Sequence, residues 1–252
     1  MLEPVRATLG SAQVLVIPGL DGQTGLWRSV ASKVLPGLHP VWFDHADDRA
    51  EGGFEGLAER ALARLDAASG STEPVYVLGE SFGGPVALTL ARRYPDRVRG
   101  LILVSTFGWY RTRVLARWAL NACQLLGDGA SHQLLCWSHP LSALGALGVN
   151  APREVVRAYL LRPLGDVRAY RAKCELILGF DARTWLGEIF HRSFVLVGTS
   201  DPVVPPSSGR LLAQELPDAS LYTVAGGHMP WCVYPERVGA MLGEWLQFNE
   251  RR

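Results

Sequence analysis

Short apolar, β-rich runs alternate with helical patterns along most of this chain. Six runs have the length of strands, the last being the weakest: QVLVIPG (13–19), HPVWFD (39–44), PVYVLGE (74–80), RGLILVS (99–105), SFVLVGTSD (193–201) and ASLYTVAGG (219–227). Most are continuously apolar, which is typical of strands covered by helices on both faces. Between several of them, apolar residues repeat at helical spacing, over 53–69, 85–98 and 238–250. This alternation predicts an α/β fold with a doubly wound, mostly parallel sheet.

The alternation stops between Phe107 and Ile189, where we find no clear strand pattern. Helical patterns follow one another there, over 110–126, 131–147, 152–162 and 166–179. A helical insertion between two strands of a parallel sheet lies at the carboxyl edge of the sheet, where such folds bind ligands. We therefore expect a core domain made of residues 1–106 and 190–252, and an all-helical cap, or lid, made of residues 107–189.

The net charge is small but unevenly distributed. The 252 residues carry a formal charge of +1, which gives no reason to expect a nucleic acid or an anionic membrane as partner. Between Thr106 and Phe180, however, nine Lys and Arg residues face four acids. This basic segment would suit an acidic carrier protein or an anionic end of a substrate. Arginines on a solvated helical face are the more ordinary interpretation.

Several classes of protein and site have no signature in the sequence. The cysteines Cys123, Cys136, Cys174 and Cys232 form no CxxC pair, so we expect reduced and mostly buried thiols. The first ten residues lack the apolar stretch of a signal peptide, and no uncharged apolar run is long enough to span a membrane. We expect a cytoplasmic protein with no membrane span. No metal-ligand spacing and no phosphate-binding glycine loop is found, so we expect no metal and no cofactor.

One serine lies between glycines directly after a strand run, in Gly79-Glu80-Ser81-Phe82-Gly83. The pattern G-x-S-x-G between a strand and a helix is that of a nucleophile elbow. The sharp turn strains the serine backbone, and the glycines allow strand and helix to pass closely. The N–H of Phe82, at the start of the helix, would point to where negative charge develops. The alternative is a glycine-rich turn with an inert serine.

A reactive serine needs an imidazole base and a carboxylate that orients it. Of the six histidines, His228 lies directly after the last strand run, at the carboxyl edge, and the others are better explained as surface or packing residues. Asp201 follows the strand run at 193–201, although an Asp before a Pro often only stabilises a turn. No acid directly follows Ser105, so Asp201 has little competition as the carboxylate.

The chain resembles the α/β-hydrolase superfamily in several segments on both flanks. These are VLVIPGLDG (14–22), the stretch 75–106, DARTWLGEI (181–189), FVLVGTSDPVVP (194–205) and GGHMPW (226–231). The order Ser81, Asp201, His228 is that of the family's triad. The resemblance also implies a second oxyanion donor at the N–H of Leu20, although Pro18-Gly19 stands where many relatives have His-Gly. Small helical-capped serine esterases, including the pimeloyl-carrier methyl-ester type, are the most similar members.

A serine at the elbow implies an acyl-enzyme intermediate. We therefore expect a serine hydrolase that cleaves carboxylic esters, with a small-molecule ester or thioester substrate that has an apolar acyl part. Trp109 and Trp231 are candidates to line its pocket, although most aromatic residues belong to cores. A thioesterase or acyltransferase with the same triad remains an alternative, and so does a non-catalytic binding module. Asp21 and Glu80 flank the site, and Arg28 is one possible partner of Asp21.

Overall fold

The computed structural model describes residues 12–110, 117, 121, 125, 129–130, 143–148, 150–162 and 165–250. Its centre is a six-stranded sheet in the order β2-β1-β3-β4-β5-β6, in which each neighbouring pair is parallel. The strands are β1 (Gln13–Ile17), β2 (His39–Trp42), β3 (Val75–Glu80), β4 (Val98–Val104), β5 (Ser193–Gly198) and β6 (Ala219–Val224). All six predicted runs form strands, which confirms the predicted sheet.

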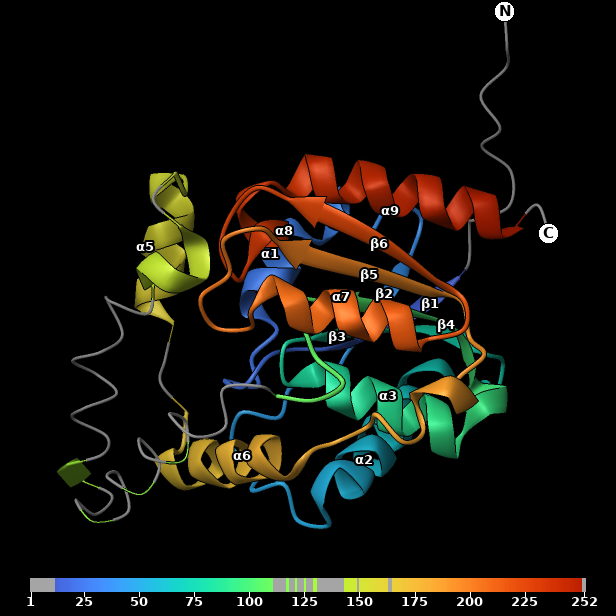
Figure 1. Ribbon diagram of the computed structural model, residues 1–252, viewed down its shortest axis with the longest axis horizontal. Helices are drawn as coiled ribbons and strands as arrows, with labels where there is room; N and C mark the ends of the chain where they lie inside the picture. Colours follow the sequence, from blue (N-terminus) through green and yellow to red (C-terminus); the bar gives the residue numbers. More distant parts are fainter. Residues whose placement is uncertain are drawn as a thin grey trace, which may run out of the picture.

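Helices cover both faces of the sheet (Figure 1). One face packs against α1 (Gly25–Val34), α8 (Pro230–Val233) and α9 (Pro235–Glu250), and the other against α2 (Gly53–Ser69), α3 (Gly83–Arg93) and α7 (Pro206–Glu215). Successive strand residues point to opposite faces, so Val14 and Val16 join the first core while Leu15 and Ile17 join the second. The sheet is therefore doubly wound, as the continuous apolar runs predict.

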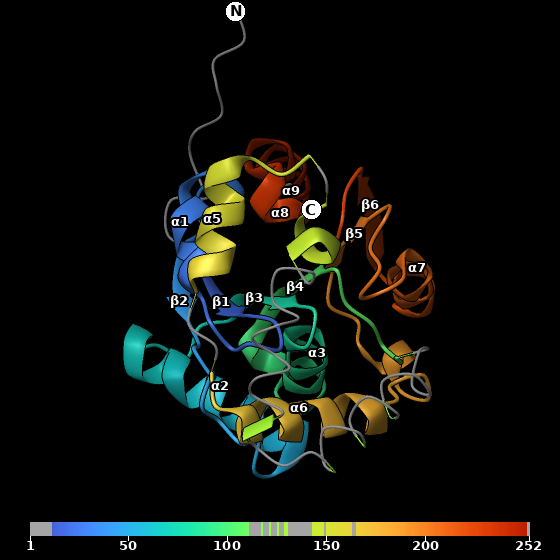
Figure 2. The same cartoon turned by 90° about the vertical axis from the view of Figure 1, so that its left-hand side faces the viewer.

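Two further helices come from the stretch 107–189. They are α5 (Arg153–Leu161) and α6 (Val167–Gly179), and both lie at the carboxyl edge of the sheet, beyond the arrowheads of the strands (Figures 1 and 2). The helices predicted over 152–162 and 166–179 are thus confirmed. Of the helix predicted over 131–147, residues 143–147 are described and helical. The rest of that segment, and most of 110–126, lies outside the described residues.

Short 3-10 turns complete the described elements. The segment η1 (Pro95–Arg97) follows α3, because Pro95 has no N–H with which to continue the helix. A second turn, η2 (Leu186–Glu188), leads back into the sheet at β5. Among the helices of the described ranges, none combines the length and the apolar character needed to cross a bilayer.

Candidate active site

Ser81 occupies a strained turn between β3 and α3. Its φ of +50° lies in the left-handed region, which residues with side chains rarely adopt. The turn is held from the next strand, because the Ser81 N–H donates to the Val104 carbonyl at 2.9 Å. The Thr106 hydroxyl in turn donates to the Ser81 carbonyl at 2.6 Å. The strained serine predicted from the G-x-S-x-G pattern is therefore present.

The glycines on either side of Ser81 are required by close backbone packing. A Cβ added to Gly79 would lie 2.5 Å from the carbonyl oxygen of Gly83. A Cβ added to Gly83 would overlap the carbonyl oxygen of Ile17, at the end of β1. The glycines thus let α3 approach β1 and β3 closely enough to hold Ser81 at the edge of the sheet.

Asp201 and His228 meet in two loops at the same edge, after β5 and β6. His228 Nδ1 lies 2.7 Å from Asp201 Oδ2. The other carboxylate oxygen, Oδ1, accepts hydrogen bonds from the N–H groups of Val203 at 2.8 Å and Val204 at 2.9 Å. Both carboxylate oxygens of Asp201 are acceptors, so the carboxylate favours the His228 tautomer in which Nδ1 carries the proton. Nε2 of His228 is then left as an acceptor.

The backbone near His228 is held by residues 145 and 146. The Met229 N–H donates to the carbonyl of Ala146 at 2.8 Å, and the His228 N–H donates to the carbonyl of Gly145 at 3.4 Å. Both carbonyls belong to the helical segment 143–147. The loop after β6 is therefore fixed partly by a segment about 80 residues earlier in the sequence.

Ser81 lies at the same edge as this pair. Strands β3, β4, β5 and β6 are consecutive neighbours in the sheet, and the three residues follow β3, β5 and β6. Among the described residues, no hydrogen bond joins the Ser81 hydroxyl to the His228 ring. Catalytic hydrogen bonds are often long in a free enzyme and tighten only with substrate. The arrangement thus brings Asp201 and His228 into contact and places Ser81 near them.

The buried surroundings shift the pKa of His228. Burial disfavours the charged ring, but the hydrogen bond and charge of Asp201, together with the charges of Glu80 and Asp21, outweigh it. The pKa of His228 is therefore raised above its ordinary value. A ring whose protonated form is stabilised in this way suits a base that must carry a proton during a reaction.

Glu80 is the last residue of β3, directly before Ser81, and it connects β3 to the loop of His228 through two tryptophans. Its Oε2 accepts a hydrogen bond from Trp27 Nε1 at 2.8 Å. The Trp27 ring stacks on Trp231 with centroids 3.7 Å apart and planes 9° from parallel. Burial raises the pKa of Glu80, and the opposing effects of His228 and Trp27 are smaller. The Trp231 N–H also lowers this pKa, although it falls short of hydrogen-bond geometry.

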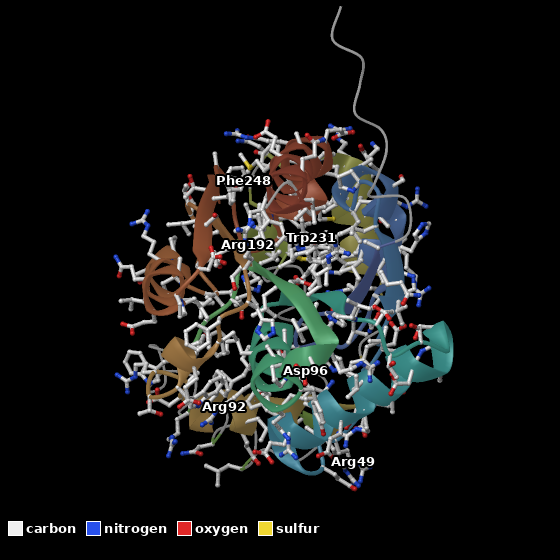
Figure 3. The ribbon with its side chains drawn as sticks, turned by 90° about the vertical axis from the view of Figure 1, so that its right-hand side faces the viewer. Arg49, Arg92, Asp96, Arg192, Trp231 and Phe248 are labelled. Carbon is white, nitrogen blue, oxygen red and sulfur yellow. The ribbon has the colours of Figure 1, made fainter. Side chains whose placement is uncertain are left out.

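The two candidate pocket residues have different surroundings. Trp231 has no exposed surface and belongs to the core between the sheet and α1, α8 and α9, where Figure 3 shows it in the interior. Trp109 is partly buried and pairs with Asp181 in an isolated antiparallel bridge. The Arg183 guanidinium lies 4.3 Å from the centre of the Trp109 ring. A role of either tryptophan in lining a pocket stays a prediction.

The two predicted oxyanion donors lie beside Ser81. Phe82 follows Ser81 directly and is the N-cap residue of α3, and the loop 18–22 after β1 passes so close that a Cβ added to Gly19 would lie 3.6 Å from Ser81 Cβ. Within the described part of the chain, neither the Leu20 N–H nor the Phe82 N–H donates a hydrogen bond. Both groups are therefore available to an oxygen that is bound next to Ser81.

Asp21, in the same loop, forms its ion pair with Arg162 at the end of α5. Arg28, the possible partner named from the sequence, does not form this pair. Arg28 instead pairs with Asp44 at 3.1 Å, because Asp44 also accepts the Thr24 hydroxyl at 2.7 Å and thereby lies over the start of α1. The partner of Asp21 lies 141 positions later in the sequence, so local spacing around Asp21 gave no indication of it.

Sequence reasoning missed Lys173, on α6. This lysine has no exposed surface, and its Nζ donates to carbonyl oxygens of His45 at 2.7 Å, Ala46 at 3.1 Å and Leu20 at 3.4 Å. Its position one helical turn after the buried Ala169 places it on the inner stripe of α6, which was the available signal. Within the described ranges, no group of three or more His, Cys, Asp or Glu side chains could hold a metal ion.

Comparison with known proteins gives relatives of one family. The model of the family described as alpha/beta hydrolase fold matches residues 14–231. A pimeloyl-[acyl-carrier protein] methyl ester esterase of Chromobacterium violaceum is 32% identical over 208 residues, which cover 75% of this chain and 80% of that protein. A poly(3-hydroxyalkanoate) depolymerase of Ectopseudomonas oleovorans is 26% identical over 256 residues, covering 95% of this chain and 86% of that protein.

Solved structures share the fold. A thermophilic esterase from Thermogutta terrifontis superposes with a TM-score of 0.75 at 21% identity, over 94% of this chain and 90% of that one. An enol-lactonase from Burkholderia xenovorans gives a TM-score of 0.78 at 17% identity, over 94% and 92% of the two chains. Since the family model covers most of the chain, and the sheet, the helices and the elbow at Ser81 are in place, the chain belongs to the α/β-hydrolase fold family.

Proposed function

We propose that this chain is a serine hydrolase that cleaves carboxylic esters through an acyl-enzyme intermediate. The observation that carries the proposal is the pairing of His228 Nδ1 with Asp201 at 2.7 Å, at the edge where Ser81 is held in a strained turn. This pairing leaves His228 Nε2 as an acceptor for the proton of Ser81. The names of the two relatives support the ester class, because one acts on a methyl ester and the other on a polyester.

The reaction proceeds in two halves. Ser81 Oγ attacks the ester carbonyl carbon while His228 Nε2 takes its proton, and the resulting oxyanion is bound by the N–H groups of Leu20 and Phe82. One such donor contributes about 100- to 1000-fold in rate. The carbon–oxygen bond to the alcohol then breaks, and the alcohol leaves with the proton from His228. A water molecule, deprotonated by His228, then attacks the acyl carbon; the bond between this carbon and Ser81 Oγ breaks, His228 returns the proton to Ser81 Oγ, and the acid is released.

We propose residues 107–189 as a helical cap over this site. Support comes from α5 and α6 at the carboxyl edge, and from the contacts that they and residues 145–146 make with the loops at the site. The proposed domain boundaries are then the ones expected from the sequence, with residues 1–106 and 190–252 as the core domain.

An acyl chain carried by an acidic protein is a second candidate form of substrate. One relative is named for an ester of an acyl-carrier protein. On α5, Arg153 and Arg157 line a hollow together with the apolar residues Val156, Leu160 and Leu161. Basic side chains around an apolar hollow suit an acidic carrier that presents an acyl group. Comparing kcat/KM for a carrier-linked ester with that for the free methyl ester tests this proposal.

The test of the function uses Ser81→Ala with Ser29→Ala as its matched control, because Ser29 is exposed on α1, where its hydroxyl donates to the Leu26 carbonyl at 2.6 Å. With p-nitrophenyl esters, we expect Ser81→Ala to lose turnover and labelling by a fluorophosphonate probe, and Ser29→Ala to keep both. Turnover retained by pure Ser81→Ala would refute the assignment. Wild-type protein that is not labelled would favour the binding module, and faster turnover of acyl-thioesters, or transfer to an added alcohol, would favour the thioesterase or acyltransferase.

A further inference from the structure

The chain contains 25 basic residues, but only Lys33 and Lys173 are lysines. Lys33 is exposed on α1 and pairs with Glu236 at 2.8 Å. Lys173 is the opposite case, because it has no exposed surface. Lysines are almost never fully buried unless their charge is paired or hydrogen-bonded. The surroundings of Lys173 therefore require an explanation.

The Lys173 ammonium group binds backbone from two loops at the carboxyl edge. Its acceptors are the carbonyls of His45 and Ala46, after β2, and that of Leu20, after β1. His45 Nδ1 lies 3.4 Å from the same nitrogen. Burial lowers the pKa of Lys173 to about 8, against the attraction of Asp21, Asp48 and Asp47. At neutral pH the group is still charged and has three N–H donors for these oxygens.

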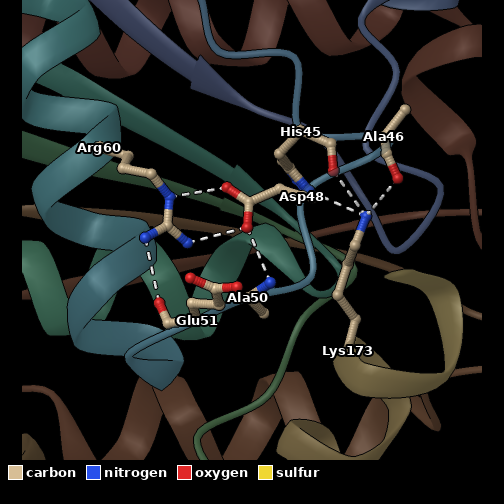
Figure 4. A network of polar contacts seen from close by, with 7 residues as sticks. All are labelled: His45, Ala46, Asp48, Ala50, Glu51, Arg60 and Lys173. Atoms are coloured by element: carbon tan, nitrogen blue, oxygen red, sulfur yellow. Dashed lines mark hydrogen bonds and ion pairs between the residues drawn. The ribbon is translucent and has the colours of Figure 1, made fainter. Parts of the chain in front are cut away.

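The loop after β2 is itself firmly held, as Figure 4 shows. Arg60 of α2 binds both carboxylate oxygens of Asp48, at 2.7 and 2.9 Å. Burial and the charge of Lys173 lower the pKa of His45 to about 4, so its ring is neutral and can donate from Nε2 to the Pro18 carbonyl at 3.4 Å. The His45 N–H donates to Gly22 at 2.8 Å. Loop 18–22 is thus attached to a fixed neighbour at both of its ends.

We propose that Lys173 is a positioning residue that holds loop 18–22 so that the Leu20 N–H points at the oxyanion. This inference rests on the proposed function, since it assigns the Leu20 N–H to the oxyanion. The acceptors support it, because Lys173 donates to backbone carbonyls of these two loops, and one of them is the carbonyl of Leu20 itself. A compact ammonium group can serve oxygens in several directions, whereas the planar guanidinium of Arg cannot.

The first experiment compares Lys173→Met, which keeps the length of the side chain but removes its N–H donors, with Lys173→Arg and the control Lys33→Met. We expect Lys173→Met to lower kcat about 10- to 100-fold with little change in KM, because a misplaced oxyanion donor acts on the transition state. Lys173→Arg keeps a cation and should recover part of kcat. Lys33→Met should match the wild type. A folded Lys173→Met with wild-type kcat, or one in which only KM rises, would overturn the inference.

A second measurement uses the wild type and holds even where a variant fails to fold. Protein labelled at lysine gives two side-chain NMR signals, from Lys33 and Lys173. A trifluoromethyl ketone that forms an adduct with Ser81 places an oxyanion near Leu20. We expect the Lys173 signal to shift and that of Lys33 to stay; an unchanged Lys173 signal in the adduct overturns the inference. Failure of the proposed function can be distinguished from failure of this inference. It would appear as turnover by Ser81→Ala and as the absence of the trifluoromethyl ketone adduct with Ser81.

Discussion

Replacing Asp201 by Asn tests the geometry of the site most directly. In the structure Oδ1 of Asp201 accepts two backbone N–H groups, from Val203 and Val204, while Oδ2 faces His228 Nδ1. An amide has one oxygen, and the two backbone donors require it. The Asn NH₂ group is then directed at His228, so Nδ1 must become the acceptor and the proton moves to Nε2. The ring is held in the tautomer that cannot take a proton from Ser81.

The expected loss follows from this tautomer. Trapping the base in the wrong tautomer lowers kcat about 10⁴-fold in a serine protease triad, which corresponds to about 5 kcal/mol of transition-state stabilisation. Because Asn keeps both backbone hydrogen bonds, we expect the variant to fold like the wild type. The assay is kcat/KM with a p-nitrophenyl ester, combined with ¹⁵N NMR of the His228 ring to identify its tautomer.

Asp218→Asn is the matched control. Asp218 pairs with Arg192 at 3.3 Å, and the two residues directly precede β6 and β5, at the amino edge of the sheet and opposite the edge that carries the site. We expect this variant to keep wild-type kcat/KM. If folded Asp201→Asn stayed within tenfold of the wild type, the reasoning that Asp201 sets the tautomer of a catalytic His228 would be refuted.

Three further predictions concern pH and packing. The pKa of His228 is raised and the base must be neutral, so kcat/KM should reach half its plateau above pH 6.5. Glu80→Gln removes a negative charge near the ring and should move this midpoint to lower pH. An unmoved midpoint would contradict an effect of the Glu80 charge on the pKa of His228. Gly83→Ala should lower the free energy of unfolding by about 1–3 kcal/mol or more in urea titrations, whereas Gly187→Ala, with nothing within 4 Å of an added Cβ, should change it little. Trp231→Ala should lose about 3–5 kcal/mol in the same assay, and a loss below 1 kcal/mol would show that the stack with Trp27 carries little stability.

The sheet and most helices could be predicted because their signals are local. The apolar run at 74–80 and the helical spacing over 53–69 each coincide with an element of the structure, β3 and α2. The helices α1 and α7 and the short helix α8 were not anticipated. The sequence of α7, PSSGRLLAQE, begins with residues typical of turns, so its short apolar stripe does not stand out.

The contacts between side chains of the candidate site could be predicted only where the order of the strands in the sheet determines them. Asp201 and His228 follow adjacent parallel strands, so their meeting at one edge follows from the order of the strands. The contacts of Glu80 with Trp27 and of Asp21 with Arg162 join residues 53 and 141 positions apart. Such contacts depend on the paths of loops, which periodicity does not encode. The placement of Trp231 in the core has the same cause.

The hydrogen bonds from His228 and Met229 to the carbonyls of Gly145 and Ala146 restrict how this protein can be recombined with its relatives. A chimera that exchanged all of 107–189 would take away the two acceptors and leave the loop after β6 to find new ones. Exchange points are better placed so that residues 143–148 stay with the parent, because the backbone of His228 and Met229 then keeps both of its acceptors.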